Sequence, residues 1–218
     1  MNLASKTKKI LFTGDSITEA GRNSLVSNDL GFGFVSNFSH MLLSRHPERT
    51  FEVINTGIGG NTVSHLLTRV HDDVIEHEAD IILILIGIND AVRIMDGASS
   101  LCLEPQEFGL AYAELVQEIR ANQPLSEIVL MSPFFLSRGN YQANSYRLRL
   151  IDMVKKYEME VEKVAENFET LFIRLSDYFY KIIDYKPSSI LSGDRIHPNG
   201  AGHMVIADAI YECLRNKL

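Results

Sequence analysis

The feature that most constrains the fold is the segment at residues 81–86, IILILI, which contains no polar side chain. A strand with one face in water alternates apolar and polar residues, whereas a strand covered on both faces is apolar throughout. Four other short, largely apolar runs are typical of strands, at residues 10–12, 51–54, 128–131 and 171–173. We therefore expect a buried sheet at the centre of the molecule.

Segments with a helical pattern lie between these strands and after the last one. In the clearest of them, residues 105–122, Pro105 suits a first helical turn. The others cover residues 33–45, 62–78, 145–167, 176–184 and 199–215. Strands that alternate with helices predict a parallel sheet with helices on both faces. No repeat, low-complexity stretch or linker divides the sequence, so residues 1–218 are expected to form one domain.

Composition limits the partners and the location that we expect for this chain. Its 218 residues suit one α/β domain, and its net charge of -7 argues against nucleic acid or an anionic membrane surface as the main partner. No apolar run approaches the ~18 residues of a membrane span, and residues 1–9 contain no signal-peptide core. Cys102 and Cys213 are expected to be free thiols. The sequence thus predicts a cytoplasmic protein.

Two short motifs at opposite ends of the chain carry the residue types of nucleophilic acyl transfer. Gly14-Asp15-Ser16 places a serine directly after the first strand, and Asp194-x-x-His197 places a histidine three residues after an aspartate. Such chemistry needs a hydroxyl, a base that takes its proton, and a carboxylate that holds the base in the right tautomer. Each motif alone is a weak signal, because the first also suits a strand end with a helix cap and the second arises often by chance.

Two further segments follow predicted strands and strengthen this interpretation. They are residues 55–62, NTGIGGNT, and residues 87–90, GIND. A tetrahedral oxyanion needs preorganised N–H donors, which a closely approaching glycine backbone and an asparagine side chain can supply. Turn chemistry for the glycines and an Asx turn for Asn89 are the simpler alternatives.

Together the four blocks resemble the SGNH (GDSL-type) serine hydrolases, whose signature residues are Ser, Gly, Asn and His in separate blocks. The blocks occur in the family's order, so the resemblance covers essentially the whole chain. They read Gly14-Asp15-Ser16-Ile17-Thr18, Asn55-x-Gly57-x-x-Gly60, Gly87-x-Asn89-Asp90 and Asp194-x-x-His197-Pro198. The resemblance implies an α/β fold, a three-layer α/β/α sandwich around a parallel sheet of about five strands, as in the flavodoxin-like fold of this family.

Carried over position by position, the family's roles fall on five residues. Ser16 would be the nucleophile, His197 the base and Asp194 the acid that orients it. The Gly60 N–H, the Asn89 side-chain amide and the N–H of Ser16 itself would form the oxyanion hole. The resemblance implies neither a metal nor a cofactor.

A finer resemblance points to the acetylxylan-esterase branch of the family, which removes acetyl groups from sugars. It rests on residues 14–22, 30–34, 57–63 and 197–204. Relatives often carry tryptophan at places that are held here by Ala91, Val92, Ser192 and Gly193. The resemblance implies a serine esterase that hydrolyses short-chain carboxylic esters through an acyl-enzyme, with acetylated carbohydrates as the favoured substrates.

Two other functions stay open. One is a lysophospholipase or thioesterase type of acylhydrolase with a longer acyl pocket, and the other is a non-catalytic binding module on the same fold. The expected partner is a small-molecule or carbohydrate ester as substrate, with no role for nucleic acid or a membrane. A homo-oligomer also stays open.

The neighbours of the site residues are given simpler roles. The glycine doublet leaves Gly59 as an alternative to Gly60, and Asp15 and Asp90 are expected to hold loops by hydrogen bonds. His203 is expected to be structural. Arg22 and Arg93 could line the entrance of the site, but solvated arginines are the default. Three histidines share one helical segment without the spacing of a helical metal site: His65, His71 and His77.

Overall fold

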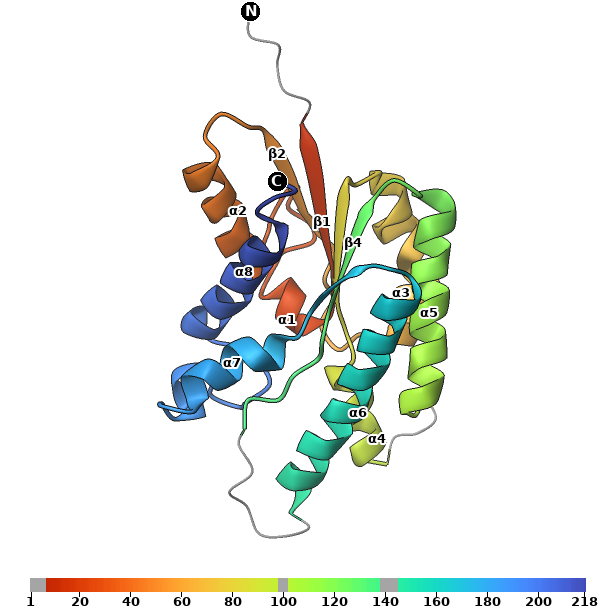
Figure 1. Ribbon diagram of the computed structural model, residues 1–218, viewed down its shortest axis with the longest axis vertical. Helices are drawn as coiled ribbons and strands as arrows, with labels where there is room; N and C mark the ends of the chain where they lie inside the picture. Colours follow the sequence, from red (N-terminus) through yellow and green to blue (C-terminus); the bar gives the residue numbers. More distant parts are fainter. Residues whose placement is uncertain (1–6, 98–101, 138–144) are drawn as a thin grey trace, which may run out of the picture.

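A five-stranded parallel sheet forms the centre of the computed structural model, which describes residues 7–97, 102–137 and 145–218 (Figure 1). The strand order is β2-β1-β3-β4-β5. The strands are β1 (Lys8–Gly14), β2 (Phe51–Asn55), β3 (Ile81–Leu85), β4 (Glu127–Met131) and β5 (Leu171–Ile173). All four pairings are parallel, which confirms the predicted sheet. The prediction about a leader segment depends mainly on residues 1–6, which lie outside the described residues.

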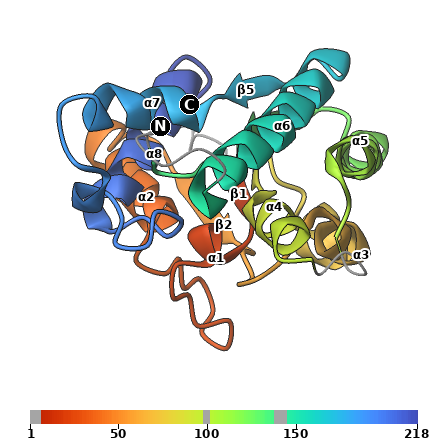
Figure 2. The ribbon, with the colours of Figure 1, turned by 90° about the horizontal axis from the view of Figure 1, so that it is seen from below.

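Helices cover both faces of this sheet. One layer contains α2, α7 and α8, and the other contains α3, α4, α5 and α6 (Figures 1 and 2). Their bounds are α1 (Ser16–Glu19), α2 (Phe34–Arg45), α3 (Val63–Asp73), α4 (Ile88–Met95), α5 (Pro105–Asn122), α6 (Tyr146–Asn167), α7 (Leu175–Ile183) and α8 (Gly200–Leu214). The three-layer α/β/α sandwich is therefore confirmed. That residues 1–218 are one domain stays a prediction.

The core explains why these segments adopt their structures. Every residue of β3 is buried, as expected for a strand with helices on both faces. On one face, the ring of Phe12 in β1 packs edge-on against Phe34 and Phe38 of α2, with ring centres 5.7 and 5.6 Å apart. On the other face, Phe108 of α5 packs against Tyr157 of α6 at 4.9 Å. Aromatic pairs thus join α2 to the sheet on one face and α5 to α6 on the other.

Two local predictions were wrong. No helix was expected directly after the third strand, but α4 begins at Ile88, because the buried Ile88 and Ala91 give this segment an apolar face. Residues 62–78 were expected to form one helix, but α3 ends at Asp73. Val74 has non-helical backbone angles and a buried side chain, and a short 3-10 turn, η1 (Ile75–His77), follows it.

The strand order indicates where a ligand would bind. From β1, the chain passes to β2 on one side, and β3 then lies on the other side of β1. Ligands in open α/β sheets bind at the carboxyl ends of strands where the order reverses in this way. Ser16 follows β1 and Asn89 follows β3, so both lie at this point. Among the described residues, no helix is long and apolar enough to cross a bilayer.

Candidate active site

Ser16 is the first residue of α1, directly after β1. The side chain of Asp15 caps this helix by accepting a hydrogen bond from the N–H of Ile17 at 2.9 Å. Gly14 allows the tight approach of β1 to β3, because a Cβ at this position would lie 2.2 Å from the carbonyl oxygen of Leu85. The backbone therefore fixes where the serine hydroxyl lies at the sheet edge.

A continuous hydrogen-bond chain joins Ser16 to the loop before α8. Ser16 Oγ lies 2.9 Å from His197 Nε2, and His197 Nδ1 lies 2.7 Å from Asp194 Oδ2. The loop is closed by an antiparallel bridge between Ser192 and Pro198. Ser16 and the Asp194-x-x-His197 motif, 181 positions apart in the sequence, thus come together with the geometry of a nucleophile, a base and an orienting acid.

The second carboxylate oxygen of Asp194 is held by its own loop. Asp194 Oδ1 accepts hydrogen bonds from the backbone N–H groups of Ile196 at 2.9 Å and His197 at 2.8 Å, and from the Ser192 hydroxyl at 3.1 Å. Burial alone would raise the pKa of Asp194, but the hydrogen bonds from His197 and Ile196 hold it well below its usual range. Asp194 is therefore an ionised, fixed acceptor.

His203, the other histidine near this site, has a different environment. Its Nδ1 accepts a hydrogen bond from the backbone N–H of Phe34 at 3.2 Å, and its ring stacks on that of Phe34. Burial, followed by the charge of His197, lowers the pKa of His203 to about 4. His203 is thus a neutral side chain that joins α8 to α2, as the structural interpretation predicted.

The loop from Asn55 to Thr62 lies beside the nucleophile. A Cβ on Gly59 would lie 3.8 Å from Ser16 Cβ and 2.9 Å from a carboxylate oxygen of Glu19. Gly60 has a φ of +76°, a conformation that favours glycine. The structure thus places Gly59 beside Ser16, with Gly60 next to it in the chain, and does not decide between them as oxyanion donors.

Asn89 is the second residue of α4, and its side chain reaches across to this loop. Its Nδ2 donates to the carbonyl oxygen of Asn61 at 3.0 Å. The contact joins residues 28 positions apart, so the amide nitrogen of Asn89 holds the glycine-rich loop. A primary amide has two N–H groups, and the second is available to a substrate oxygen.

The expectation that Arg22 and Arg93 are simply solvated was wrong. The guanidinium of Arg22 donates to the carbonyl oxygen of Gly57 at 2.9 Å, and that of Arg93 donates to the carbonyl oxygen of Gly60 at 2.7 Å. Both contacts are partly buried. The two arginines therefore hold the glycine-rich loop from different segments, Arg22 from the turn after α1 and Arg93 from α4.

The positions where relatives often carry tryptophan offer little platform for a sugar ring. Ala91 is fully buried in α4, and Ser192 is buried and bonded to Asp194. Ser192 is also a supporting residue that the sequence did not reveal, because its hydroxyl accepts from the N–H of Arg195 at 2.8 Å as well. Ser192 makes both hydrogen bonds within its own loop, and no sequence motif marks such a residue.

The three histidines of the 62–78 segment lie in separate environments. His65 forms a capping box with Thr62 at the start of α3. His71, Asp72 and Glu76 bring ligand-type atoms within 4.8 Å of one another, but all three side chains are exposed. This is the one group in the described residues that could hold a metal ion, and it lies at the end of α3 that points away from the glycine-rich loop.

Asp15 and Asp90 are fully buried carboxyl groups beneath the site. Asp15 caps α1, and Asp90 accepts from the N–H of Val63, the first residue of α3, at 3.4 Å. Burial raises the pKa of each to about 7. The charge of Asp15 further raises the pKa of Asp90. Both therefore hold helix starts, and both are mostly protonated in the folded protein below about pH 7.

A raised pKa in the folded state has a defined consequence for stability. Between pH 4 and 7, the folded protein binds a proton at Asp90 that the unfolded chain does not bind, so the free energy of unfolding from this group falls as pH rises. Asp90→Asn should remove this dependence. Its free energy of unfolding relative to wild type should rise by more than about 1.4 kcal/mol from pH 4 to 7 and then stay level.

Urea unfolding at several pH values measures this difference. Asp152→Asn is the matched control, because Asp152 lies exposed on α6 and its substitution should not reproduce the change with pH expected for Asp90→Asn. A pH-independent difference for Asp90→Asn would show that this carboxyl is not held neutral by burial.

Comparisons with known proteins agree with this geometry. Residues 12–205 match the profile of the GDSL-like Lipase/Acylhydrolase family. An acetylxylan esterase from Geobacillus stearothermophilus is 34% identical over 209 residues, covering 93% of this chain and 91% of the relative. An uncharacterized protein from Bacillus subtilis, YpmR, is 25% identical and covers 98% of this chain and 85% of its own.

Solved structures show the same likeness over nearly the whole chain. The crystal structure of Axe2, an acetylxylan esterase from Geobacillus stearothermophilus, has a TM-score of 0.83 at 33% identity, covering 97% of this chain and 95% of that one. LAE5, an alpha/beta hydrolase enzyme from a lake metagenome, has a TM-score of 0.85 at 31% identity, covering 94% of each chain. The resemblance inferred from the four blocks is confirmed, and the chain belongs to the GDSL-like lipase/acylhydrolase family.

Proposed function

We propose that this protein is a serine esterase that removes short acyl groups, above all acetyl groups, from carbohydrate esters. The observation that carries the proposal is the hydrogen-bond chain from Ser16 Oγ through His197 to Asp194, with donor–acceptor distances of 2.9 and 2.7 Å. This arrangement lowers the cost of removing the serine proton as the hydroxyl attacks.

In the first half of the reaction, Ser16 Oγ attacks the ester carbonyl carbon and His197 Nε2 takes its proton. Asp194 stays ionised and stabilises the imidazolium that forms. The carbonyl oxygen becomes an oxyanion that accepts hydrogen bonds from the N–H groups of Ser16 and Gly60 and from the Asn89 amide. Collapse of this intermediate breaks the bond to the alcohol, which leaves with the proton from His197.

In the second half, water replaces the alcohol. His197 takes a proton from the water as its oxygen attacks the acyl carbon of the acyl-enzyme, and the same donors hold the second oxyanion. When this intermediate collapses, the proton returns to Ser16 Oγ and the carboxylic acid is released. Every group that moves a proton is therefore supplied by the chain itself.

The preference for short acyl groups rests on the surroundings of Ser16 and on the relatives. The Glu19 carboxylate lies against Gly59 beside the nucleophile, and a charged group is a poor lining for a long hydrocarbon chain. The relatives described as acetylxylan esterases support acetylated sugars as substrates. A cytoplasmic location and a homo-oligomer stay proposals from the sequence.

The acyl preference is measured with 4-nitrophenyl esters and an acetylated xylooligosaccharide. We expect kcat/KM to fall by at least about tenfold, or about 1.4 kcal/mol, from acetate to octanoate, and acetate to be released from the sugar. Ser16→Ala should remove turnover of both, whereas Ser24→Ala, at an exposed serine, should not. A higher kcat/KM for octanoate would favour the lysophospholipase or thioesterase alternative, and no turnover of any ester would favour a binding module.

The role of Asn89 gives a second prediction. An interaction made only in the transition state lowers kcat and leaves ground-state binding largely unchanged. Asn89→Ala should therefore lower kcat by on the order of 10²–10³ with little change in KM. If its contact with Asn61 were its whole purpose, the melting temperature would fall while kcat per folded molecule survived, so kcat, KM and melting temperature are measured together.

A further inference from the structure

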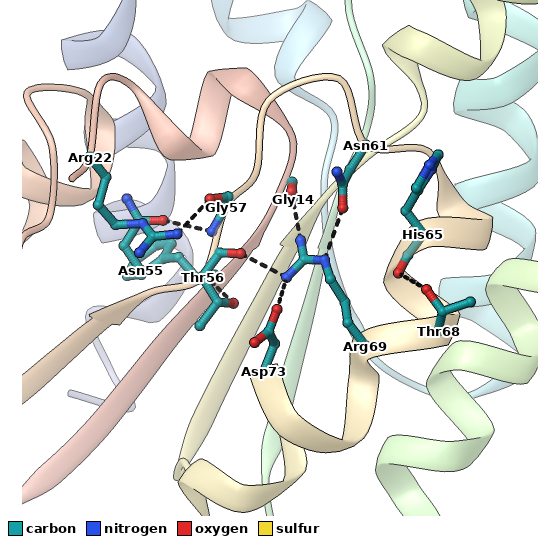
Figure 3. Close-up of polar contacts among 11 residues, drawn as sticks. Gly14, Arg22, Asn55, Thr56, Gly57, Asn61, His65, Thr68, Arg69 and Asp73 are labelled. Carbon is teal, nitrogen blue, oxygen red and sulfur yellow. Dashed lines mark hydrogen bonds and ion pairs between the residues drawn. The ribbon is translucent and has the colours of Figure 1, made fainter. Parts of the chain in front are cut away.

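The guanidinium of Arg69, on α3, has a set of partners that the proposed reaction does not use (Figure 3). Its Nε donates to Asn61 Oδ1 at 2.9 Å, Nη1 to the carbonyl oxygen of Thr56 at 2.8 Å, and Nη2 to that of Gly14 at 3.1 Å. Nη1 also pairs with the carboxylate of Asp73, one helical turn along α3. The Arg69 side chain is only 15% exposed.

The partners of Arg69 come from separate segments that must meet at the sheet edge. Gly14 is the last residue of β1, two positions before Ser16. Thr56 and Asn61 flank the glycine-rich stretch that contains Gly60. One guanidinium therefore ties the end of the nucleophile strand to both ends of the loop, as Figure 3 shows.

Asn61 extends this connection to the third proposed donor. Its side chain accepts from Arg69, and its carbonyl oxygen accepts from Asn89 Nδ2 at 3.0 Å. The carbonyl oxygen of Gly14 likewise accepts from the N–H of Ile58 at 3.1 Å. Each oxyanion donor is thus one or two residues, or one hydrogen bond, away from a group that Arg69 holds.

The physical need for such an anchor follows from the loop itself. Glycines have wide backbone freedom, and an oxyanion hole stabilises charge well only when its N–H donors are already fixed. A planar guanidinium presents several donors in a rigid fork, which a lysine ammonium cannot reproduce. Arg22 and Arg93 each hold one carbonyl of the loop, whereas Arg69 bridges the loop and the strand.

We propose that Arg69 is a positioning residue for the oxyanion hole: it fixes the Gly60 and Asn89 donors relative to Ser16 and touches no substrate atom itself. This inference rests on the proposed function. Asp73 balances the charge of Arg69 and orients its fork. The effect of Arg69 should therefore appear in the stabilisation of the transition state and hardly at all in substrate affinity.

The test compares Arg69→Lys and Arg69→Ala with wild type on 4-nitrophenyl acetate, with rates expressed per folded molecule. Arg69→Lys keeps the charge and the pairing with Asp73 but loses the fork. We expect kcat to fall by about 10²-fold with KM changed less than about threefold. Affinity for methylboronic acid, whose adduct on Ser16 imitates the tetrahedral intermediate, should fall by a similar factor. Methylguanidinium should restore part of the rate of Arg69→Ala.

Arg120→Lys is the matched control. Its guanidinium donates to one carbonyl oxygen, that of Ser126, just before β4. This contact lies at the amino ends of the strands, away from Ser16 at their carboxyl ends, so kcat should be unchanged. If Ser16→Ala removes activity while Arg69→Lys keeps its kcat and boronate affinity per folded molecule, the positioning role is wrong. The role would also be wrong if Arg69→Lys only reduced the amount of folded protein. It would likewise be wrong if KM rose by as large a factor as kcat fell. Activity that survives in Ser16→Ala would instead contradict the proposed function.

Discussion

The parallel pairing of β1 with β2 on one side and with β3 on the other is the constraint on which the rest of the site depends. It aligns the ends of three strands, so that Ser16, the glycine-rich loop and Asn89 emerge at one edge. The pairing is tight enough that position 14 has no room for a side chain. The loop before α8, which contains Asp194 and His197, then completes the hydrogen-bond chain to Ser16.

The two halves of the site are stabilised in different ways. The Asp194 loop is held by hydrogen bonds within residues 192–198, with Ser192 as its internal anchor. The glycine-rich loop has little side-chain volume of its own, and arginines from three other segments bind its carbonyl and amide oxygens. A glycine-rich backbone beside the nucleophile, with wide conformational freedom of its own, is thus fixed by arginines that take no part in the reaction.

Much of this could be predicted from the sequence, because the signals were local. The five strands follow from short apolar runs, and the apolar segment at residues 81–86 indicated the central strand β3 correctly. The residue types of the site follow from four motifs, each within a few positions, and the structure places Ser16, His197 and Asp194 within hydrogen-bond distance. Helix α4 was missed because polar Asn89 and Asp90 near its start resemble a turn.

What escaped prediction depends on contacts between distant segments. Arg69 meets Gly14 across 55 positions of sequence, and Arg93 meets Gly60 across 33. Arginine on a helix usually faces water, so periodicity gives no sign that its guanidinium turns inward to carbonyl groups. Asp15 and Asp90 were expected to hold loops, but their burial follows from the packing of strand ends that no single segment reveals.

The central claim is that His197 activates Ser16, and covalent labelling with a fluorophosphonate tests it most directly. Peptide mass spectrometry locates the adduct, and the labelling rate is compared between wild type and His197→Ala. We predict one adduct per chain, on Ser16, formed slower by about 10²-fold or more in His197→Ala. An adduct on another serine, or equal labelling rates in the two proteins, would contradict the account.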